Sequence, residues 1–300
     1  APAASPAASS PTSSGGRTFC TSRTEAFRWK DTASAVKCSN GELPGGSYRL
    51  GANSYSISDF VGTGEGVPSP WLKIWTCSAA GTRVIQTNNV PNHDIDKYTD
   101  TDLCAQYYKW TLPLNPTMLP DGSEIESAVS LGISLKGPII YDAKESDGLN
   151  AILGQEIVDE GGNAPRDAAY WHGHPSPQEV WHYHSPEIGY ETYPSIDTVI
   201  GYAFDGYPIF PPLADDSVLD ECNFNTATGS GYHVRTKDQV GATTATDYCK
   251  ASGDPANNWN YIIGCYRADP NLSIQEIDDD AKIDPVGCTL EFSHGSDDEQ

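Results

Sequence analysis

Short runs of alternating apolar and polar residues recur along the chain and predict β-strands. Residues 72–77 and 82–87 alternate on either side of a turn at Ala80-Gly81, which predicts a β-hairpin. Residues 131–140 predict a strand, a tight turn and a second strand. Long runs with a 3.6-residue apolar period are absent, so the pattern argues against a helical bundle.

A third hairpin is predicted for residues 198–210, where Asp205-Gly206 favours a two-residue type I′ turn. Residues 261–266 are mostly apolar and predict a buried strand, and residues 150–157 predict one short helix. The 28 glycines and 22 prolines among 300 residues imply many loops. Together these features predict a mainly β, disulfide-linked and loop-rich domain, sandwich-like or barrel-like, with few short helices.

Composition divides the chain into four segments. Residues 1–16 are almost wholly Ala, Pro, Ser, Thr and Gly, so we expect them to be disordered. Residues 17–70 are predicted to form a small disulfide-containing β extension. Residues 71–270 are expected to form the main domain, and residues 271–300 an acidic, exposed C-terminal segment.

The formal net charge of −23 limits the possible partners. Such a chain repels DNA, RNA and anionic membranes, so we expect no nucleic-acid partner. It contains no apolar run of about 18 residues, so we also expect no membrane insertion. No charged-then-apolar leader is present, which suggests a mature secreted, extracellular product. Asn271 begins the one N-glycosylation sequon, so a glycoprotein is expected.

The eight cysteines are an even number and contain no Cys-x-x-Cys motif. This usage favours four disulfides in an oxidising compartment over thiolate metal sites. Spacing suggests local bridges between Cys20 and Cys38 and between Cys77 and Cys104. Two further bridges are expected among the last four cysteines, although other connectivities remain open: Cys222, Cys249, Cys265 and Cys288.

Four of the seven histidines lie within residues 171–184, in two Trp-His-x-His runs separated by a proline-containing turn. On a strand, residues i and i+2 share a face about 6.6 Å apart, so each pair can share one cation. Neutral imidazole binds zinc and copper well. A hairpin with His174 opposite His182 puts all four on one face, whereas a one-residue slip separates the pairs. Both registers remain open, as does a purely structural role in which the rings stack and hydrogen-bond.

Alternating acids follow His93 and raise the question of a calcium site. They are Asp94, Asp96, Asp100 and Asp102. Oxygen ligands suit Ca²⁺, but the EF-hand spacing fails because the required Gly and Glu are missing. A solvated acidic loop is therefore favoured over calcium binding.

Several ordered motifs run through residues 73–267. They are Asn-Val-Pro-Asn-His at 89–93, Gly-Ile-Ser-Leu-Lys-Gly at 132–137, His-Tyr-His at 182–184, Ile-Gly-Tyr-Ala-Phe-Asp-Gly-Tyr-Pro-Ile at 200–209, Leu-Asp-Glu-Cys-Asn at 219–223, Gly-Tyr-His at 231–233 and Tyr-Ile-Ile-Gly-Cys at 261–265. In this order they resemble the YHYH-domain family of secreted proteins. The resemblance implies secretion but no established activity.

Two departures from the family's eponymous motif affect the site. The motif reads Trp181-His182-Tyr183-His184 here. A second copy is read as Tyr232-His233-Val234-Arg235, so its last histidine is missing. A site that used this last imidazole would be weakened or lost.

The first functional hypothesis is a secreted protein that binds a copper-type or zinc-type transition metal. The expected ligands are His182, His184, His172 and His233, with His174 and His93 ranked lower. Four further residues are expected near the metal: Tyr183, Tyr232, Asp205 and Glu221. The two tyrosines are expected mainly to pack, and either acid could orient an imidazole through its second nitrogen. A turn role is favoured for Asp205 over a role as general base.

Two alternatives come from other classes. The protein could be a structural extracellular glycoprotein, such as a self-assembling filament or matrix subunit, with structural histidines. It could also be a metal-dependent hydrolase or oxidoreductase, since an open metal position can activate water. Gly-x-Ser-x-Gly and His-Glu-x-x-His motifs are absent, so an enzymatic activity would depend on the metal alone.

Overall fold

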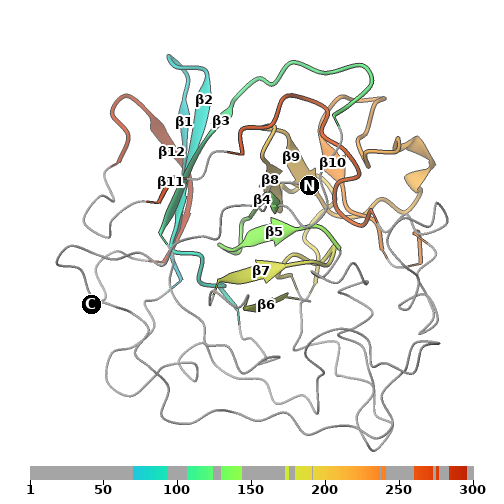
Figure 1. The fold of residues 1–300 in the computed structure, drawn as a ribbon, viewed down its shortest axis with the longest axis horizontal. Coiled ribbons are helices and arrows are strands. Elements are labelled where there is room, and N and C mark those ends of the chain that lie inside the picture. Colours follow the sequence, from blue (N-terminus) through green and yellow to red (C-terminus); the bar gives the residue numbers. More distant parts are fainter. Residues whose placement is uncertain are drawn as a thin grey trace, which may run out of the picture.

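The computed structural model describes residues 70–93, 107–123, 130–143, 173–175, 180–190, 192–236, 238–240, 260–272, 275–276 and 284–295. These residues form mainly β-strands in two open sheets, and neither sheet closes into a barrel (Figure 1). The helical content of this part is one 3₁₀ turn, η3 (Asp216–Val218). The predicted mainly β, loop-rich class is therefore confirmed. Within the described residues, no helix is long and apolar enough to cross a membrane.

The first sheet has five strands. In spatial order they are β11 (Gln275–Glu276), β3 (Tyr108–Pro113), β2 (Thr82–Thr87), β1 (Leu72–Cys77) and β12 (Thr289–His294). β1 and β2 form the predicted hairpin, paired antiparallel from Leu72 and Thr87 to Cys77 and Thr82. Both edge strands come from the predicted acidic C-terminal segment.

The second sheet has seven strands. In spatial order they are β10 (Tyr232–His233), β9 (Pro208–Phe210), β8 (Gly201–Ala203), β4 (Ser130–Ser134), β5 (Ile139–Tyr141), β7 (Trp181–Tyr183) and β6 (Gly173–Pro175). The hairpins β4–β5 and β8–β9 confirm the two remaining predictions of this kind. The predicted helix at residues 150–157 lies outside the described residues.

The turn between β8 and β9 contains three residues, so the predicted two-residue type I′ turn is wrong. The N–H of Ala203 donates to the carbonyl of Tyr207 at 2.9 Å, and the N–H of Gly206 donates to that of Ala203 at 2.9 Å. The carboxylate of Asp205 accepts from the N–H of Tyr207 at 3.2 Å and stabilises this longer connection. Gly206 closes it with a φ of 96°, which glycine adopts without steric cost. The predicted turn role of Asp205 is therefore confirmed.

Residues 261–263 and 266 are buried and residues 264–265 are half-buried, but the predicted strand is wrong. Their backbone groups bond to separate loops instead of one neighbouring strand. The N–H of Gly264 donates to the carbonyl of Cys222 at 3.1 Å, and the N–H of Tyr266 donates to that of Ser123 at 2.9 Å. An apolar run signals burial, and periodicity alone does not reveal the conformation that achieves it.

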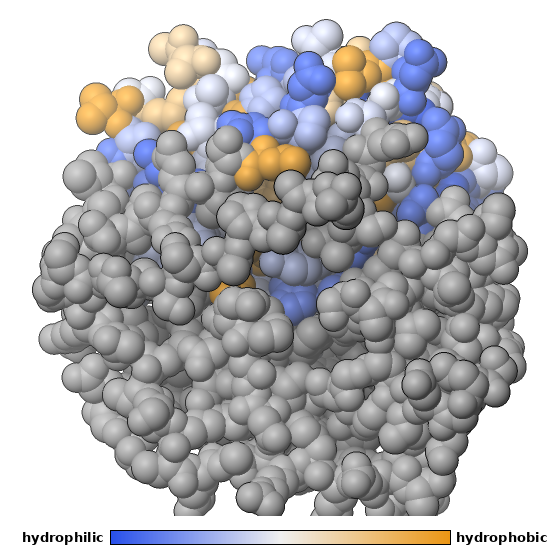
Figure 2. Space-filling view, in the orientation of Figure 1, coloured by the Kyte–Doolittle hydropathy of each residue, from blue (hydrophilic) through white to orange (hydrophobic). Residues whose placement is uncertain are grey.

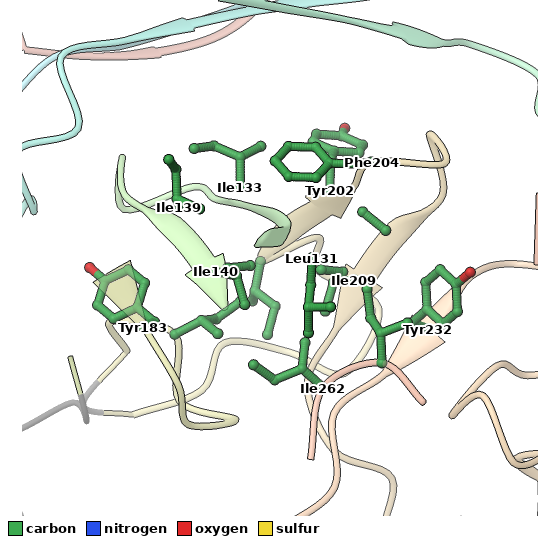
Figure 3. Packing of buried hydrophobic residues seen from close by; sticks show 14 of the residues in the cluster. Leu131, Ile133, Ile139, Ile140, Tyr183, Tyr202, Phe204, Ile209, Tyr232 and Ile262 are labelled. Atoms are coloured by element: carbon green, nitrogen blue, oxygen red, sulfur yellow. The ribbon is translucent and has the colours of Figure 1, made fainter. Parts of the chain in front are cut away.

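One hydrophobic core joins the two sheets. Trp110 of β3 stacks on Phe204, which follows β8, with ring centroids 5.6 Å apart and an interplanar angle of 22°. Burial of each such ring stabilises the fold by about 2–3 kcal/mol. Figure 3 shows the isoleucines and aromatic rings of the seven-stranded sheet converging in this core. On the described part of the surface in Figure 2, hydrophilic and hydrophobic residues are interspersed.

Two disulfides lie within the described residues, Cys77–Cys288 and Cys222–Cys265. The predicted bridge from Cys77 to Cys104 is therefore wrong. One bridge among the last four cysteines is confirmed, Cys222–Cys265, but a second is wrong because Cys288 pairs with Cys77. The reason is the pairing of β12 with β1, which brings Cys288 to the end of β1 across 211 positions of sequence. The other four cysteines lie outside the described residues: Cys20, Cys38, Cys104 and Cys249.

The seven-stranded sheet consists of two halves with the same strand arrangement. β4 and β5 form an antiparallel hairpin, and β7 runs parallel to β5 on its outer side. β8 and β9 form an antiparallel hairpin, and β10 runs parallel to β9 on its outer side. The two halves meet where β4 pairs antiparallel with β8, with Ile133 opposite Tyr202. An approximate two-fold axis therefore passes between these two residues.

The hydrogen bonds and the sequence follow the same symmetry. Residues 131–142 align with residues 200–211 without a gap, and glycine occupies the second and seventh positions of both. The bond from Leu135 N–H to Ile200 C=O, at 2.9 Å, matches that from Phe204 N–H to Leu131 C=O, at 3.0 Å. This repeat is visible once the two segments are written one above the other, although alternation of apolar residues alone does not reveal it.

Candidate metal centre

The strand β7 presents different side chains on its two faces. Trp181 and Tyr183 are fully buried in the core, and His182 between them belongs to the opposite face. β6 pairs antiparallel with β7, with His174 opposite His182, so these two positions belong to one face. Of the two registers that the sequence left open, the structure has the one that puts the histidine positions on a common face.

The imidazole rings of His182 and His184 lie side by side. Their centroids are 4.7 Å apart and the rings meet edge to face at 78°. Both side chains are buried, with exposed fractions of 4% and 2%. These are the two residues that the sequence ranked first as metal ligands, and the structure brings them together.

Backbone carbonyls determine the tautomer of both rings. Nδ1 of His182 lies 3.1 Å from the carbonyl oxygen of Val180, and Nδ1 of His184 lies 2.5 Å from that of Asp142. A carbonyl oxygen only accepts hydrogen bonds, so each Nδ1 carries the proton. In the neutral rings the lone pair is therefore on Nε2. Metal-bound histidines commonly show this arrangement, in which the second nitrogen donates to a carbonyl.

Tyr141, at the end of β5, is a neighbour of both histidines that the sequence reasoning missed. Its ring centroid lies 4.4 Å from that of His182 and 6.1 Å from that of His184. Burial raises the pKa of Tyr141, against a hydrogen bond with the Ser130 side chain that lowers it. The phenol therefore acts as a neutral ring that restricts both imidazoles. The parallel pairing of β5 and β7 creates this contact, and parallel pairing leaves no local signal in the sequence.

His233 does not join this pair, so a site that combines it with His182 and His184 is not formed. It lies in β10, five strand positions from β7, which is on the order of 20 Å at about 4.8 Å per strand. Its ring stacks on Phe210 at 5.2 Å, and its Nδ1 lies 2.9 Å from the carbonyl oxygen of Pro211. Figure 3 shows the preceding tyrosine, Tyr232, far across the core from Tyr183.

The two-fold relation also corrects the reading of the second motif copy. Ile140 pairs with Tyr183 and the equivalent Ile209 pairs with Tyr232, so the two tyrosines correspond. His184 then corresponds to His233, and His182 corresponds to a glycine. The second copy therefore lacks its first histidine, not its last. That glycine, Gly231, has a φ of 147°, and a Cβ there would lie 2.4 Å from a backbone oxygen. The second half therefore has no room for a histidine pair.

His93 contacts β7 from the opposite face. Its Nε2 lies 2.6 Å from the hydroxyl of Tyr183, and its ring centroid lies 6.3 Å from that of Trp181. Burial raises the pKa of Tyr183 well above its usual value, so the phenol is neutral. His93 is a lower-ranked predicted ligand. It cannot share a metal with His182, because β7 separates the two side chains.

Asp205 does not orient an imidazole of the histidine pair, contrary to one predicted role, and Tyr232 packs in the core beside it, as expected. The Asp205 carboxylate is fully buried and accepts a short hydrogen bond from the Tyr232 hydroxyl. It also accepts from the backbone N–H groups of Arg267 at 3.0 Å and Ala268 at 3.1 Å. Burial raises the pKa of Asp205 to about 6, and these hydrogen bonds offset part of the rise. The Asp205 carboxylate therefore connects the β8–β9 turn with β10 and with residues 267–268.

Glu221 lies on the surface and accepts from the Arg267 guanidinium at 3.0 Å, so it too is remote from the histidine pair. Among the described residues, Glu221, Cys222 and Cys265 form a compact group of metal-ligand types. The two sulfurs are bonded to each other, so they offer no thiolate. This group is therefore not a metal site.

Some predicted site residues cannot be placed. His172 and the four aspartates at 94, 96, 100 and 102 lie outside the described residues, and only the backbone position of His174 is described. Asn271 is exposed, and its side-chain amide donates to the carbonyl of Thr111 at 2.8 Å.

The fold and site define a class: a mainly β, disulfide-linked protein with a buried histidine pair near the edge of one sheet. The model of the family described as "YHYH protein" matches residues 109–276, which is more than half of the chain. The protein belongs to this family, as its motifs suggested. The match covers all seven strands of the second sheet but begins after β1 and β2. No curated protein and no solved structure matches the chain significantly.

Proposed function

We propose that the protein binds one transition metal ion of the copper or zinc type through His182 and His184. One observation carries this proposal: two adjacent buried imidazoles both donate from Nδ1 to carbonyls and so have basic Nε2 atoms. Neutral imidazole nitrogens suit copper and zinc, whereas calcium prefers oxygen ligands. Chelation by two rings held in place costs less entropy than ligation by two free side chains.

The further ligands are expected at His174 in β6 and at His172, which precedes this strand in the sequence. The pairing of His174 with His182 supports His174 more strongly than its lower rank in the sequence suggested. His172, outside the described residues, stays a predicted ligand because of its His-x-His spacing to His174. Four imidazoles would complete a tetrahedral or tetragonal centre, and three would leave one position open to water.

The test is elemental analysis of the purified protein, followed by titration of the metal-free protein with Zn²⁺ and Cu²⁺. We expect close to one equivalent of bound metal. The double variant His182→Ala/His184→Ala should lose at least tenfold in affinity, and His294→Ala should bind as the unmodified chain does. Absence of stoichiometric binding by the unmodified chain would sink the proposal.

A secreted, extracellular location is part of the proposal. The two disulfides within the described residues support it, because disulfides persist in oxidising compartments. The exposed Asn271 sequon is consistent with a glycoprotein. Mass spectrometry of the protein from its source, before and after glycosidase treatment, tests both points.

A structural role for the histidines is the second candidate function. His233 favours it, because its carbonyl partner, Pro211, is equivalent to the Asp142 partner of His184 and its aromatic neighbour is similar. In place of a second imidazole it has Gly231 at the equivalent position. A buried histidine can thus serve this fold without a metal. In that case the protein would be a structural extracellular glycoprotein, and size-exclusion chromatography would reveal its self-assembly.

A further inference from the structure

We infer that Asn89 and His93, in the segment 88–93, position the strand that carries the histidine pair. This inference rests on the proposed metal-binding function. Both residues contact β7, and both lie before residues 109–276, the range that the family model matches. Asn89 contacts Trp181, the residue before His182, and His93 contacts Tyr183, the residue after it.

Asn89 bridges β5 and β7 with its side-chain amide. The Nδ2 group donates to the carbonyl of Trp181 at 2.8 Å, and Oδ1 accepts from the N–H of Ile139 at 3.0 Å. These two strands are parallel neighbours, with Ile139 opposite His182. The amide therefore stands between the strands in the way that a peptide group would, directly before His182.

The backbone around Asn89 is itself held in place. Asn89 is fully buried and has a φ of 58°, the left-handed conformation that asparagine tolerates better than most residues. Its N–H donates to the hydroxyl of Thr87 at 2.9 Å, at the end of β2. The next side chain back, Asn88, accepts from the N–H of Trp71 at 3.0 Å. The five-stranded sheet is thereby coupled to β7.

His93 holds the other side of His182 through the next side chain. Its Nε2 is hydrogen-bonded to the Tyr183 hydroxyl at 2.6 Å. The N–H of the preceding residue, Asn92, donates to the carbonyl of Lys136 at 2.9 Å and fixes the end of the segment. The backbone before His182 and the ring after it are thus both restrained, which limits the positions that the imidazoles can adopt.

The second half of the sheet indicates why an external segment is needed. There the hydroxyl of the equivalent tyrosine, Tyr232, donates a hydrogen bond to Asp205, in the β8–β9 turn of the same half. The position equivalent to Asp205 in the first half is Lys136, and the Tyr183 hydroxyl is hydrogen-bonded to His93 instead. The first half therefore depends on segment 88–93 for a restraint that the second half supplies internally.

The test for Asn89 uses matched glycine variants of the full chain. Asn89→Gly keeps the left-handed backbone accessible but removes both hydrogen bonds of the amide. Asn223→Gly is the control, because Asn223 is also buried, has a φ of 64° and donates to carbonyls, but lies in the second half. Outer partners of metal ligands typically affect affinity 10–100-fold. We therefore expect Asn89→Gly to weaken Cu²⁺ binding at least tenfold and to change the Cu²⁺ electron paramagnetic resonance spectrum, while Asn223→Gly stays within about twofold.

The test for His93 distinguishes a positioning residue from a ligand. Glutamine can still hydrogen-bond the Tyr183 hydroxyl, so His93→Gln should retain most of the affinity, whereas His93→Phe should lose it. If both variants abolish binding equally, His93 is a ligand and the inference fails. If both Asn89→Gly and His93→Phe bind as the unmodified chain does, with unchanged spectra, the inference also fails although metal binding stands. If Asn89→Gly does not fold, the His93 pair decides alone. Lack of binding by the unmodified chain would instead refute the proposed function.

Discussion

His184 and His233 occupy equivalent positions in the two halves of the seven-stranded sheet. Each donates from Nδ1 to the carbonyl of an equivalent residue, Asp142 at 2.5 Å and Pro211 at 2.9 Å. His184 has a second imidazole 4.7 Å away, and the second half has Gly231 at the corresponding place. The two histidines are therefore alike as structural donors and different as candidate ligands.

Alanine at either position should separate these two roles. His184→Ala and His233→Ala should each destabilise the protein by about 1–3 kcal/mol, because each removes a buried hydrogen bond and a packed ring. Only His184→Ala should weaken Zn²⁺ binding. Urea unfolding measures the first effect and calorimetric titration the second. Equal loss of metal from both variants would show that the effect is on folding and not on ligation.

The glycines at the two-fold axis, Gly132 and Gly201, should both be intolerant of substitution. A Cβ at Gly132 would lie 2.3 Å from the carbonyl oxygen of Tyr202, and one at Gly201 would lie 2.8 Å from that of Ile133. Alanine at either place should therefore cost about 1–3 kcal/mol in overpacking, with the larger effect at Gly132. Gly229→Ala is the control, because no atom lies within 4 Å and only its left-handed φ of 65° is penalised. Thermal unfolding checks the order of the three variants.

The hairpins could be predicted because each joins strands that are neighbours in the chain. The strands β1 and β2 follow directly from alternation around Gly81, and the glycine-containing turns of the second sheet are equally local. The pairing of β12 with β1 and of β7 with β5 could not be predicted, because long-range pairing depends on the packing of the whole core. The wrong disulfide at Cys77 follows from the same limitation.

Only the part of the site that lies on one stretch of extended chain, His182 and His184, could be predicted from the sequence. The spacing of His182 and His184 on an extended chain was sufficient to bring them together. The exclusion of His233 required the strand order, and the contact with Tyr141 required a parallel neighbour. The bridge made by Asn89 requires a left-handed residue within a loop, and alternation of apolar residues carries no information about such a position.

The bridge Cys77–Cys288 should contribute strongly to stability because it spans 211 positions. The chain-entropy model gives about 5 kcal/mol for a loop of this length, against about 4 kcal/mol for the 43 positions spanned by Cys222–Cys265. The double variant Cys77→Ser/Cys288→Ser should therefore lower the denaturation midpoint and release β12 from β1. Peptide mapping without reduction should recover the two cysteines in one linked pair. A linked pair of Cys77 with Cys104 would contradict the structure.

Asp205 should make the protein less stable as the pH rises from about 4 to 6. Burial raises its pKa from 3.8 to about 6 in the folded protein, so the folded state binds more protons than the unfolded state in this window. Stability then falls as the pH rises through the window, by about 3 kcal/mol for a shift of about two units, and levels off above it.

Asn cannot ionise, so Asp205→Asn should remove this slope. It should also be less stable than the unmodified protein at pH 4, since an amide next to the N–H groups of Arg267 and Ala268 loses acceptor capacity. Urea unfolding at pH 4, 5, 6 and 7 measures both curves, and their difference isolates Asp205 because the other acids are common to both proteins. Parallel curves would mean that the buried carboxyl keeps its ordinary pKa and that the Tyr232 hydroxyl and the backbone donors fully offset the cost of burial.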